Sequence, residues 1–207
     1  RKNRPSVSIQ RGKLTSDAQF VKMSYSDVYT ITTGSSVVTQ LMRGNNLYDP
    51  DFTGAGHQPR GFDQYTPLYK QWVVYGSKIG CRFTTNGTFP INCVLLPRVI
   101  GPILPAKATA YAETKYGKLK TMVKQASSPT FLGGYMSTAK MFGRTPASIT
   151  AEFIFHGDNA SGPSAGGEWY WVAGVQAIDG VTVETVYVTL TITYYAKFFE
   201  RIVPDES

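Results

Sequence analysis

Apolar and polar residues alternate with a period of two along most of the chain, the pattern of strands that bury one face. The clearest segment is the last, in which every second residue from Val186 to Ala196 is apolar and Thr189, Thr191 and Thr193 lie between them. Its length predicts a strand inside a sheet, paired along both edges. The clear segments are 19–33, 73–83, 91–96, 118–124, 168–178 and 184–201, and the weaker ones are 135–142 and 148–155.

The number and spacing of these segments predict the fold class. About eight strands without a repeat of fixed period are typical of an all-β protein, and we expect a single eight-stranded jelly-roll sandwich. Composition agrees, because 20 Gly and 12 Pro supply turns while 13 Tyr and 11 Phe favour strands. The 207 residues suffice for one core.

A long connection interrupts the alternation. About forty residues separate the strand that ends near Thr33 from the strand that starts near Val73, far more than an ordinary turn. Part of this segment is expected to be helical, with Thr66 as N-cap and Pro67 in the first helical position. We therefore predict a long, partly helical loop between the first two strands, and a loop of this size indicates a role in binding or partner contact.

Positive charge is concentrated at the start of the chain. The net charge is +7, but the residues from Asp17 onward contain 16 basic and 14 acidic side chains and so carry only +2. We expect residues 1–16 to be the end of a longer Arg-rich arm and residues 17–207 to be the jelly-roll domain. Such an arm binds nucleic acid by neutralising phosphates, and a solubilising tail is the alternative. The predicted contacts are Arg1, Lys2, Arg4, Arg11 and Lys13.

Two glycine-rich segments resemble catalytic motifs without meeting their requirements. GAGHQPRG, beginning at Gly54, lacks the preceding strand and the Lys-Ser/Thr pair of a phosphate-binding loop. GPSAG, centred on Ser164, has no histidine after it, whereas a hydrolase nucleophile elbow requires one. Turns and a flexible loop explain these segments better.

Candidate metal ligands are equally sparse. His57 and His156 are the two histidines, and Asp49 with Asp51 could hold a cation only with further acidic residues nearby. We therefore predict no enzymatic activity, no metal and no cofactor. No apolar run has membrane-spanning length, so no membrane partner is expected.

Cysteines and tryptophans are assigned to the interior. Cys81 and Cys93 lie on successive strands, which a jelly roll places in opposite sheets, so we expect free thiols. Trp169 and Trp171 occupy alternating positions and are expected in the core, with a base-stacking surface as the alternative.

A cluster of lysines without acids marks a possible polyanion or receptor site. In 118–124 the lysines alternate with Leu119, Thr121 and Val123, so they share one face of a strand. This face could bind nucleic acid or a sulfated polysaccharide, or it could simply be solvated. The residues are Lys115, Lys118, Lys120 and Lys124.

Three longer segments resemble the capsid proteins of circovirus-like, Rep-encoding circular single-stranded DNA viruses. They are GNNLYDPDFTGAGHQPRGFDQYTPLYKQWVVYGSKI (44–79), WYWVAGVQAIDG (169–180) and TVYVTLTITYYAKFFER (185–201). The resemblance implies a T=1 icosahedral shell of about sixty copies, a packaged single-stranded DNA genome, and location in the virion and, during assembly, the host nucleus. A host-cell receptor or glycan is a further expected partner.

The resemblance also gives the long loop a role. The loops at the ends of a jelly roll are where subunits meet, so its polar and aromatic residues become candidates for contacts within or between subunits. A lectin-like sandwich that recognises glycans is the alternative function, and an enzyme on the same fold is disfavoured. The candidate interface residues are Asp49, Asp51, His57, Phe62, Asp63, Gln64 and Tyr65.

Overall fold

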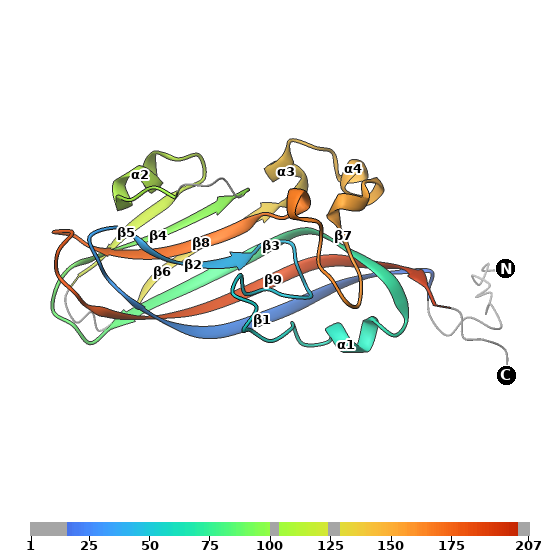
Figure 1. The fold of residues 1–207 in the computed structure, drawn as a ribbon, viewed down its shortest axis with the longest axis horizontal. Helices are drawn as coiled ribbons and strands as arrows, with labels where there is room; N and C mark the ends of the chain where they lie inside the picture. Colours follow the sequence, from blue (N-terminus) through green and yellow to red (C-terminus); the bar gives the residue numbers. More distant parts are fainter. Residues whose placement is uncertain (1–15, 100–103, 124–128, 203–207) are drawn as a thin grey trace, which may run out of the picture.

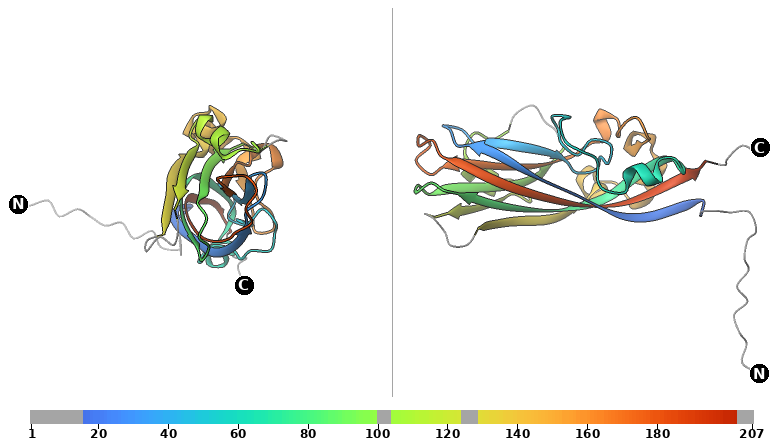
Figure 2. Two further views of the ribbon diagram at one scale, coloured as in Figure 1. Left: turned by 90° about the vertical axis from the view of Figure 1, so that its left-hand side faces the viewer. Right: turned by 90° about the horizontal axis from the view of Figure 1, so that it is seen from below.

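The computed structural model describes residues 16–99, 104–123 and 129–202. Its strands form two antiparallel sheets that face each other in an elongated sandwich (Figure 1 and Figure 2). One sheet has the order β1-β9-β3-β6, with β7 beside β3, and the other has the order β2-β8-β4-β5. The strands are β1 (Ala18–Thr32), β2 (Val38–Arg43), β3 (Tyr69–Thr85), β4 (Ile91–Arg98), β5 (Lys118–Met122), β6 (Thr130–Ser137), β7 (His156–Gly157), β8 (Tyr170–Ala177) and β9 (Thr185–Arg201).

The predicted all-β sandwich is confirmed, with β7 as a short strand that the expected eight did not include. The last strand lies inside its sheet, because β9 pairs with β1 over Ala18–Thr32 and with β3 on its other edge. Both cysteines are buried and free, and they lie in opposite sheets as expected, Cys81 on β3 and Cys93 on β4.

The long connection after β1 contains a strand that the sequence did not reveal. The β2 strand pairs with β8, so the prediction of one unbroken loop between the first two strands is wrong. Its residues do not alternate clearly, because Leu41 and Met42 are consecutive apolar residues and each packs on a different face of the strand. Met42 is buried between the sheets, while Leu41 packs against a second cluster outside them. The segment 44–68, which follows β2, remains a long loop.

The helix in this loop begins earlier than expected. It is α1 (Phe62–Tyr65), and Thr66 is its C-cap rather than an N-cap. The chain enters β3 at Tyr69, because Tyr69 pairs with Arg201 of β9 and continues the sheet.

The two weak strand candidates are largely replaced by helices. The segment 135–142 ends β6 and continues as α3 (Thr138–Phe142), and 148–155 contains α4 (Pro146–Ala151) and the 3-10 helix η1 (Phe153–Phe155). The helices α3 and α4 each have a side-chain N-cap: Ser137 accepts from Lys140 N, and Thr145 accepts from Ser148 N. Ser or Thr followed closely by a helix-compatible residue is a start signal that the alternation concealed.

A β-bulge between Val74 and Gly76 divides β3 into two parts. Before it, Trp72 and Val74 face the main core; after it, Ile79 and Cys81 do. The extra residue shifts the inward positions from even to odd numbers, as a bulge must. On the outward face, odd-numbered residues such as Val73 therefore give way to even-numbered residues beyond the bulge.

Helices cover parts of both outer faces. The helix α2 (Ala108–Glu113) packs Tyr111 against Val94 and Val172 on the outside of the β2-β8-β4-β5 sheet. On the other sheet, α3, α4 and η1 cover the outward side of Val73, with Ile149 in the same buried cluster. These helices lie at the end of the sandwich where β7 pairs with β3 (Figure 1).

Candidate functional site

The base of the 44–68 loop is held by Arg43, the last residue of β2. Its Nη1 donates to Asp49 Oδ2 at 2.7 Å, to the Asp49 carbonyl at 3.1 Å and to the Asp51 carbonyl at 2.6 Å. Its Nε lies 3.4 Å from Glu168 Oε1, and its guanidinium lies over the ring of Phe52. The candidate residue Asp49 is therefore an ion-pair partner within the chain.

Two buried asparagines fix the loop to the segment before β8. Asn45 Nδ2 donates to the Gly167 carbonyl at 2.8 Å and its Oδ1 accepts from Trp169 N at 3.0 Å. Asn46 Nδ2 donates to Glu168 Oε1 at 2.7 Å, and Tyr170 OH donates to Glu168 Oε2 at 2.6 Å. Segments more than 120 residues apart in sequence are thereby locked together.

The carboxylate of Asp51 is buried and fully engaged within the chain. Its Oδ2 accepts from Tyr29 OH at 2.8 Å, and its Oδ1 accepts from Thr53 N at 2.8 Å and from Gln40 Nε2 at 3.3 Å. Tyr25 and Tyr29 hydroxyls lie 2.9 Å apart and continue the chain of hydrogen bonds. Asp51 thus joins the loop to β1 and leaves no free oxygen for a cation.

The two tyrosines of this network stay neutral donors. Burial raises the pKa of Tyr25 to about 12. Burial, and then the hydrogen bonds with Tyr25 and Asp51, raises the pKa of Tyr29 well above its ordinary value. Ionising either phenol would place a negative charge in a buried position beside the carboxylate of Asp51.

His57 lies at the surface beside this network. Its ring stacks on Tyr25 at 4.5 Å between centroids, and its Nδ1 and Nε2 lie 2.7 Å from the Gln58 carbonyl and 3.3 Å from the Ser26 carbonyl. His156 lies elsewhere, between Gln71 and the Thr150 carbonyl. Among residues 16–99, 104–123 and 129–202, no three metal-ligating side chains form a group.

The aromatic candidates of the loop pack inside the subunit. Phe62 is 1% exposed and contacts the rings of Trp72 and Phe198 at 6.0 and 6.3 Å. Tyr65 stacks on Phe198 at 5.1 Å. Assigning Phe62 to a contact between subunits is therefore corrected: its side chain belongs to the core. Asp63, beside it, is exposed.

The candidate residues of the loop differ in their exposure to solvent. Asp63, Gln64 and His57 present their side chains to solvent, whereas Asp51 and Phe62 do not. The loop therefore has an inner row of residues that sets its conformation and an outer row that is free to meet a partner.

The described lysines of β5, Lys118 and Lys120, are exposed, and they lie at the edge of the sandwich. Lys118 and Lys120 share the side of the strand that buries Met122, so they point towards the space between the sheets at the edge of the sandwich. Lys118 Nζ donates to the Gly133 carbonyl of β6. Leu119 and Val123 are the residues that face outward, at 36% and 61% exposure.

Of the other basic candidates, only Lys115 lies within the described residues, and it is exposed. Lys115 Nζ lies 5.2 Å from the ring centroid of Tyr116. Lys124 and the arm residues Arg1, Lys2, Arg4, Arg11 and Lys13 lie outside the described residues. The described chain starts at Ser16, whose carbonyl accepts from Tyr69 OH at 2.8 Å.

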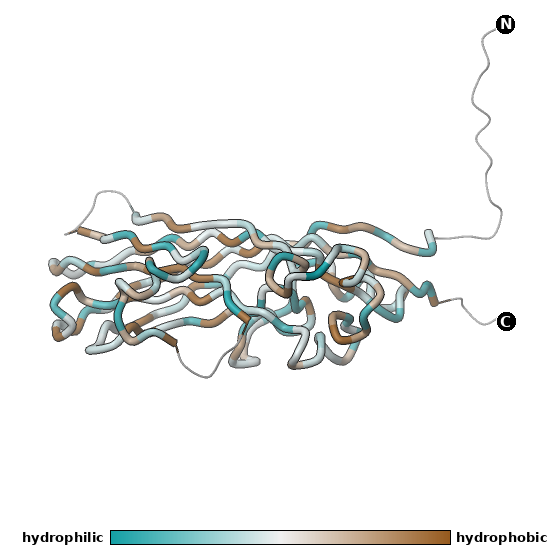
Figure 3. The backbone as a smooth tube through the Cα atoms, turned by 90° about the horizontal axis from the view of Figure 1, so that it is seen from above, coloured by the Kyte–Doolittle hydropathy of each residue, from teal (hydrophilic) through white to brown (hydrophobic). Residues whose placement is uncertain are grey.

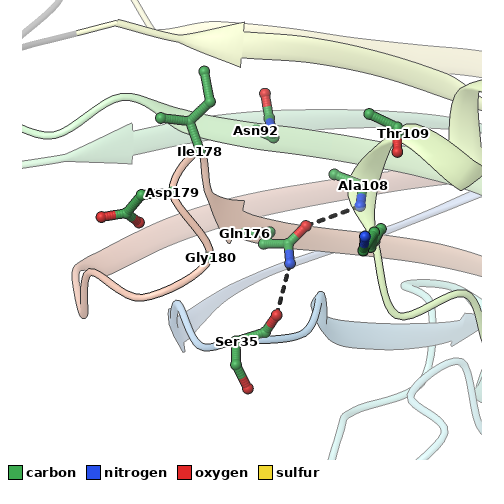
Figure 4. Close-up of a pocket in the computed structure, with 9 residues that line it drawn as sticks. Ser35, Asn92, Ala108, Thr109, Gln176, Ile178, Asp179 and Gly180 are labelled. Carbon is green, nitrogen blue, oxygen red and sulfur yellow. Dashed lines mark hydrogen bonds between the residues drawn. The ribbon is translucent and has the colours of Figure 1, made fainter.

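A polar hollow of about 420 Å³ lies between β8, the start of α2 and the loop after β1 (Figure 4). Gln176 spans it: Oε1 accepts from Ala108 N at 2.9 Å and Nε2 donates to the Ser35 carbonyl at 2.9 Å. Both ends of this amide therefore make hydrogen bonds within the chain. Gln176 links three segments and has no free polar group to offer a ligand in the hollow.

Trp169 and Trp171 were predicted to be core residues, with a base-stacking surface as the alternative. Trp169 and Trp171 are buried, with ring centroids 5.3 Å apart, and their Nε1 atoms donate to Thr138 and Ser77 hydroxyls. They are core residues and cannot stack on an external base or sugar. No helix in the described ranges has the length and apolarity to cross a membrane.

Comparison with known proteins identifies the fold. No protein-family model and no curated protein matches the sequence. The solved structure of Mud crab tombus-like virus has a TM-score of 0.54 at 8% identity, covering 98% of this chain and 91% of that chain. The 60-mer BFDV capsid protein has a TM-score of 0.48 at 12% identity, covering 93% of this chain and 100% of that chain. Desmodium yellow mottle tymovirus has a TM-score of 0.47 at 11% identity, covering 99% of this chain and 100% of that chain. The likeness to the first structure shows that this chain shares the jelly-roll fold of a viral protein.

Proposed function

We propose that this chain is the capsid protein of a circovirus-like, Rep-encoding circular single-stranded DNA virus. It self-assembles into a T=1 shell of about sixty copies, and its places are the virion and, during assembly, the host nucleus. The observation that carries this proposal is that the sandwich leaves apolar side chains exposed in two separate regions. A structural role of this kind requires neither catalysis nor a cofactor.

One end, which we call the loop end, is formed by the loops 33–37, 86–90 and 178–184. Thr33 N donates to the Glu184 carbonyl at 2.9 Å, so two of these loops lie side by side. Ile178, Val181 and Val183 are 57%, 77% and 70% exposed, and hydrophobic segments are visible at these loops in Figure 3. Apolar residues gathered on adjacent loops are typical of a surface that a partner covers.

A second exposed apolar set lies away from the loop end, on the 44–68 loop and η1. Tyr48 and Phe52 are exposed on the loop, and Phe153 and Ile154 are exposed on η1. Two separate apolar surfaces on one subunit suit the heterologous contacts that build closed shells, since each surface meets a different neighbour. His57, Asp63 and Gln64 then supply the polar rim of such a contact.

The basic arm is proposed to hold the genome. Arg1, Lys2, Arg4, Arg11 and Lys13 would neutralise phosphates of single-stranded DNA without reading its sequence, because phosphates carry no base identity. Replacing all five with Gln should reduce the slope of log affinity against log salt by up to about 3.5, at about 0.7 per phosphate contact. An unchanged slope would leave the arm as a solubilising tail.

The lectin-like alternative receives less support from the structure. Its aromatic platform was Trp169 and Trp171, and both are buried. A host-cell receptor or glycan stays a proposed partner of the assembled particle, with Lys115, Lys118 and Lys120 as candidate contacts for a sulfated chain.

The direct test of the proposed function is assembly. Purified chain is examined by negative-stain electron microscopy and light scattering over a range of salt and protein concentrations. Closed particles of uniform size are expected. Monomers or dimers at every condition would refute the proposal, and so would open filaments.

A further inference from the structure

The β1-β9-β3-β6 sheet has a large outward surface that no other element of the described chain covers. Beyond the bulge in β3, every second residue of 22–30, 78–84, 131–135 and 187–195 faces outward. The helices α3 and α4 cover only the part of the sheet before the bulge, around Val73. We call the uncovered part the open face.

Every charged side chain on the open face is positive. Lys22, Lys78 and Arg82 point outward from it, and none of its outward positions holds Asp or Glu. Within the described residues, none of these three cations forms an ion pair. A solvated sheet face normally mixes both signs of charge, so a surface with cations alone favours an anionic partner.

Aromatic side chains alternate with these cations. Across the β3–β6 pair, Lys78 lies opposite Tyr135 and Arg82 lies opposite Phe131, while Gly80 and its Gly133 partner separate the two pairs. Four residues along a strand span about 13 Å. Both rings are more than half exposed. Two aromatic–cation pairs therefore flank a stretch of backbone that carries no side chain.

The aromatic surface continues onto the central strand. Tyr195 of β9 meets Tyr135 edge to face at 5.9 Å, and Tyr187 is exposed on the same strand. At the β1 edge, a hollow of about 500 Å³ is lined by Ser24, Ser26, His57 and Arg60. Polar and basic groups therefore also lie at the β1 edge of the open face.

We propose that the open face binds single-stranded DNA directly, with phosphates on Lys22, Lys78 and Arg82 and bases stacked on Phe131 and Tyr135. Exposed rings beside cations are the general means by which proteins hold single strands without sequence preference. A sulfated polysaccharide would use the cations but has no flat base to stack. The inference rests on the proposed function for the identity of the ligand, and it adds a binding surface on the folded domain to the arm.

Charge variants test the phosphate contacts. The full chain with Lys78→Gln and Arg82→Gln is compared with Lys107→Gln and Arg144→Gln, which removes the same charge from residues off the open face. Binding of a fluorescent oligothymidine of about 20 nucleotides is measured by anisotropy in about 50–200 mM salt. The first pair should lower the salt slope by about 1.4, at about 0.7 per phosphate contact, and the control should leave it unchanged.

Stacking variants separate DNA from other polyanions. Phe131→Thr with Tyr135→Thr keeps residues that suit a strand and should weaken oligothymidine binding on the order of tenfold or more per base, with an unchanged salt slope. Phe153→Thr, an exposed aromatic change elsewhere, serves as the control. Heparin binding, measured in parallel, should not respond to either.

The outcomes distinguish this inference from the proposed function. Reduced binding in both open-face variants, with particle assembly intact, supports it. Wild-type affinity and slope in both variants overturn it, even if particles form normally. Equal losses for heparin and DNA in the charge variant, with none in the stacking variant, also overturn it in favour of a sulfated polysaccharide. Failure of the wild-type chain to assemble refutes the capsid proposal without affecting this comparison.

Discussion

Replacing Phe62 with Ala tests whether the 44–68 loop is part of the core or only part of a contact between subunits. Phe62 is 1% exposed and lies against Trp72, Phe198 and Tyr48. Truncating a buried Phe to Ala removes its transfer free energy and leaves a cavity, at about 3–5 kcal/mol. In a domain of this size, about 4 kcal/mol corresponds to a fall in Tm of about 8–16 °C.

The measurement is thermal unfolding of dissociated subunits, followed by circular dichroism, because assembly would add its own stabilisation. Gln64→Ala is the matched control on the same helix, exposed and without a core contact, and should change stability by no more than about 0.5 kcal/mol. If Phe62→Ala leaves Tm unchanged in the dissociated subunit but abolishes particles, the side chain acts between subunits and the core assignment is wrong.

Three further predictions concern the loop end, the thiols and the tyrosine network. Val181→Asp with Val183→Asp should abolish particles in electron microscopy while leaving subunit Tm within about 2 °C; normal particles would remove the loop end from the interface. Cys81 and Cys93 should resist a thiol reagent at pH 8 in the native protein, since burial raises both pKa values, that of Cys93 to about 12, and both should react after unfolding without reductant; rapid native labelling would contradict their burial. The pKa of Tyr25 is raised in the folded state, so its contribution to stability is complete below pH 10 and is lost as the pH rises towards about 12. Denaturant titrations from pH 9 to 12 should show this loss of stability. In Tyr25→Phe the pH-dependent loss should be smaller, and an equal loss in this variant would contradict the assignment to Tyr25.

The sequence predicted best those strands with one buried and one solvent-exposed face. β9 and β1 alternate almost without interruption, and their bounds differ from the prediction by one or two residues. β2 was missed because its consecutive residues Leu41 and Met42 are both apolar and pack on opposite faces, which removes the period of two. The segment 148–155 was taken for a strand because its Ile and Phe residues cover a sheet from a short helix, where apolar spacing is ambiguous.

Side-chain roles were harder to predict than strands. The resemblance drew attention to Asp49 and Asp51, and both take part in hydrogen bonds that fix the loop. Arg43 and Glu168, which complete that network, were not singled out, because their pairing joins positions 125 residues apart and no local pattern marks it. The direction of the β5 lysines was also missed, since alternation alone does not tell which face turns inward.

The direction of Lys118 and Lys120, on the side of β5 that buries Met122, affects whether subunits can associate by backbone hydrogen bonds between edge strands. β5 and β6 are the edge strands on one side of the sandwich, and an uncovered edge is a template for strand addition and fibril growth. Lys118 and Lys120 place charge where an added strand would have to bury it, and Lys118 occupies the Gly133 carbonyl of β6. Growth by continuous sheet extension is therefore disfavoured at this side of the molecule. Association is left to side chains on loops, whose contacts are reversible and can correct errors before a structure closes.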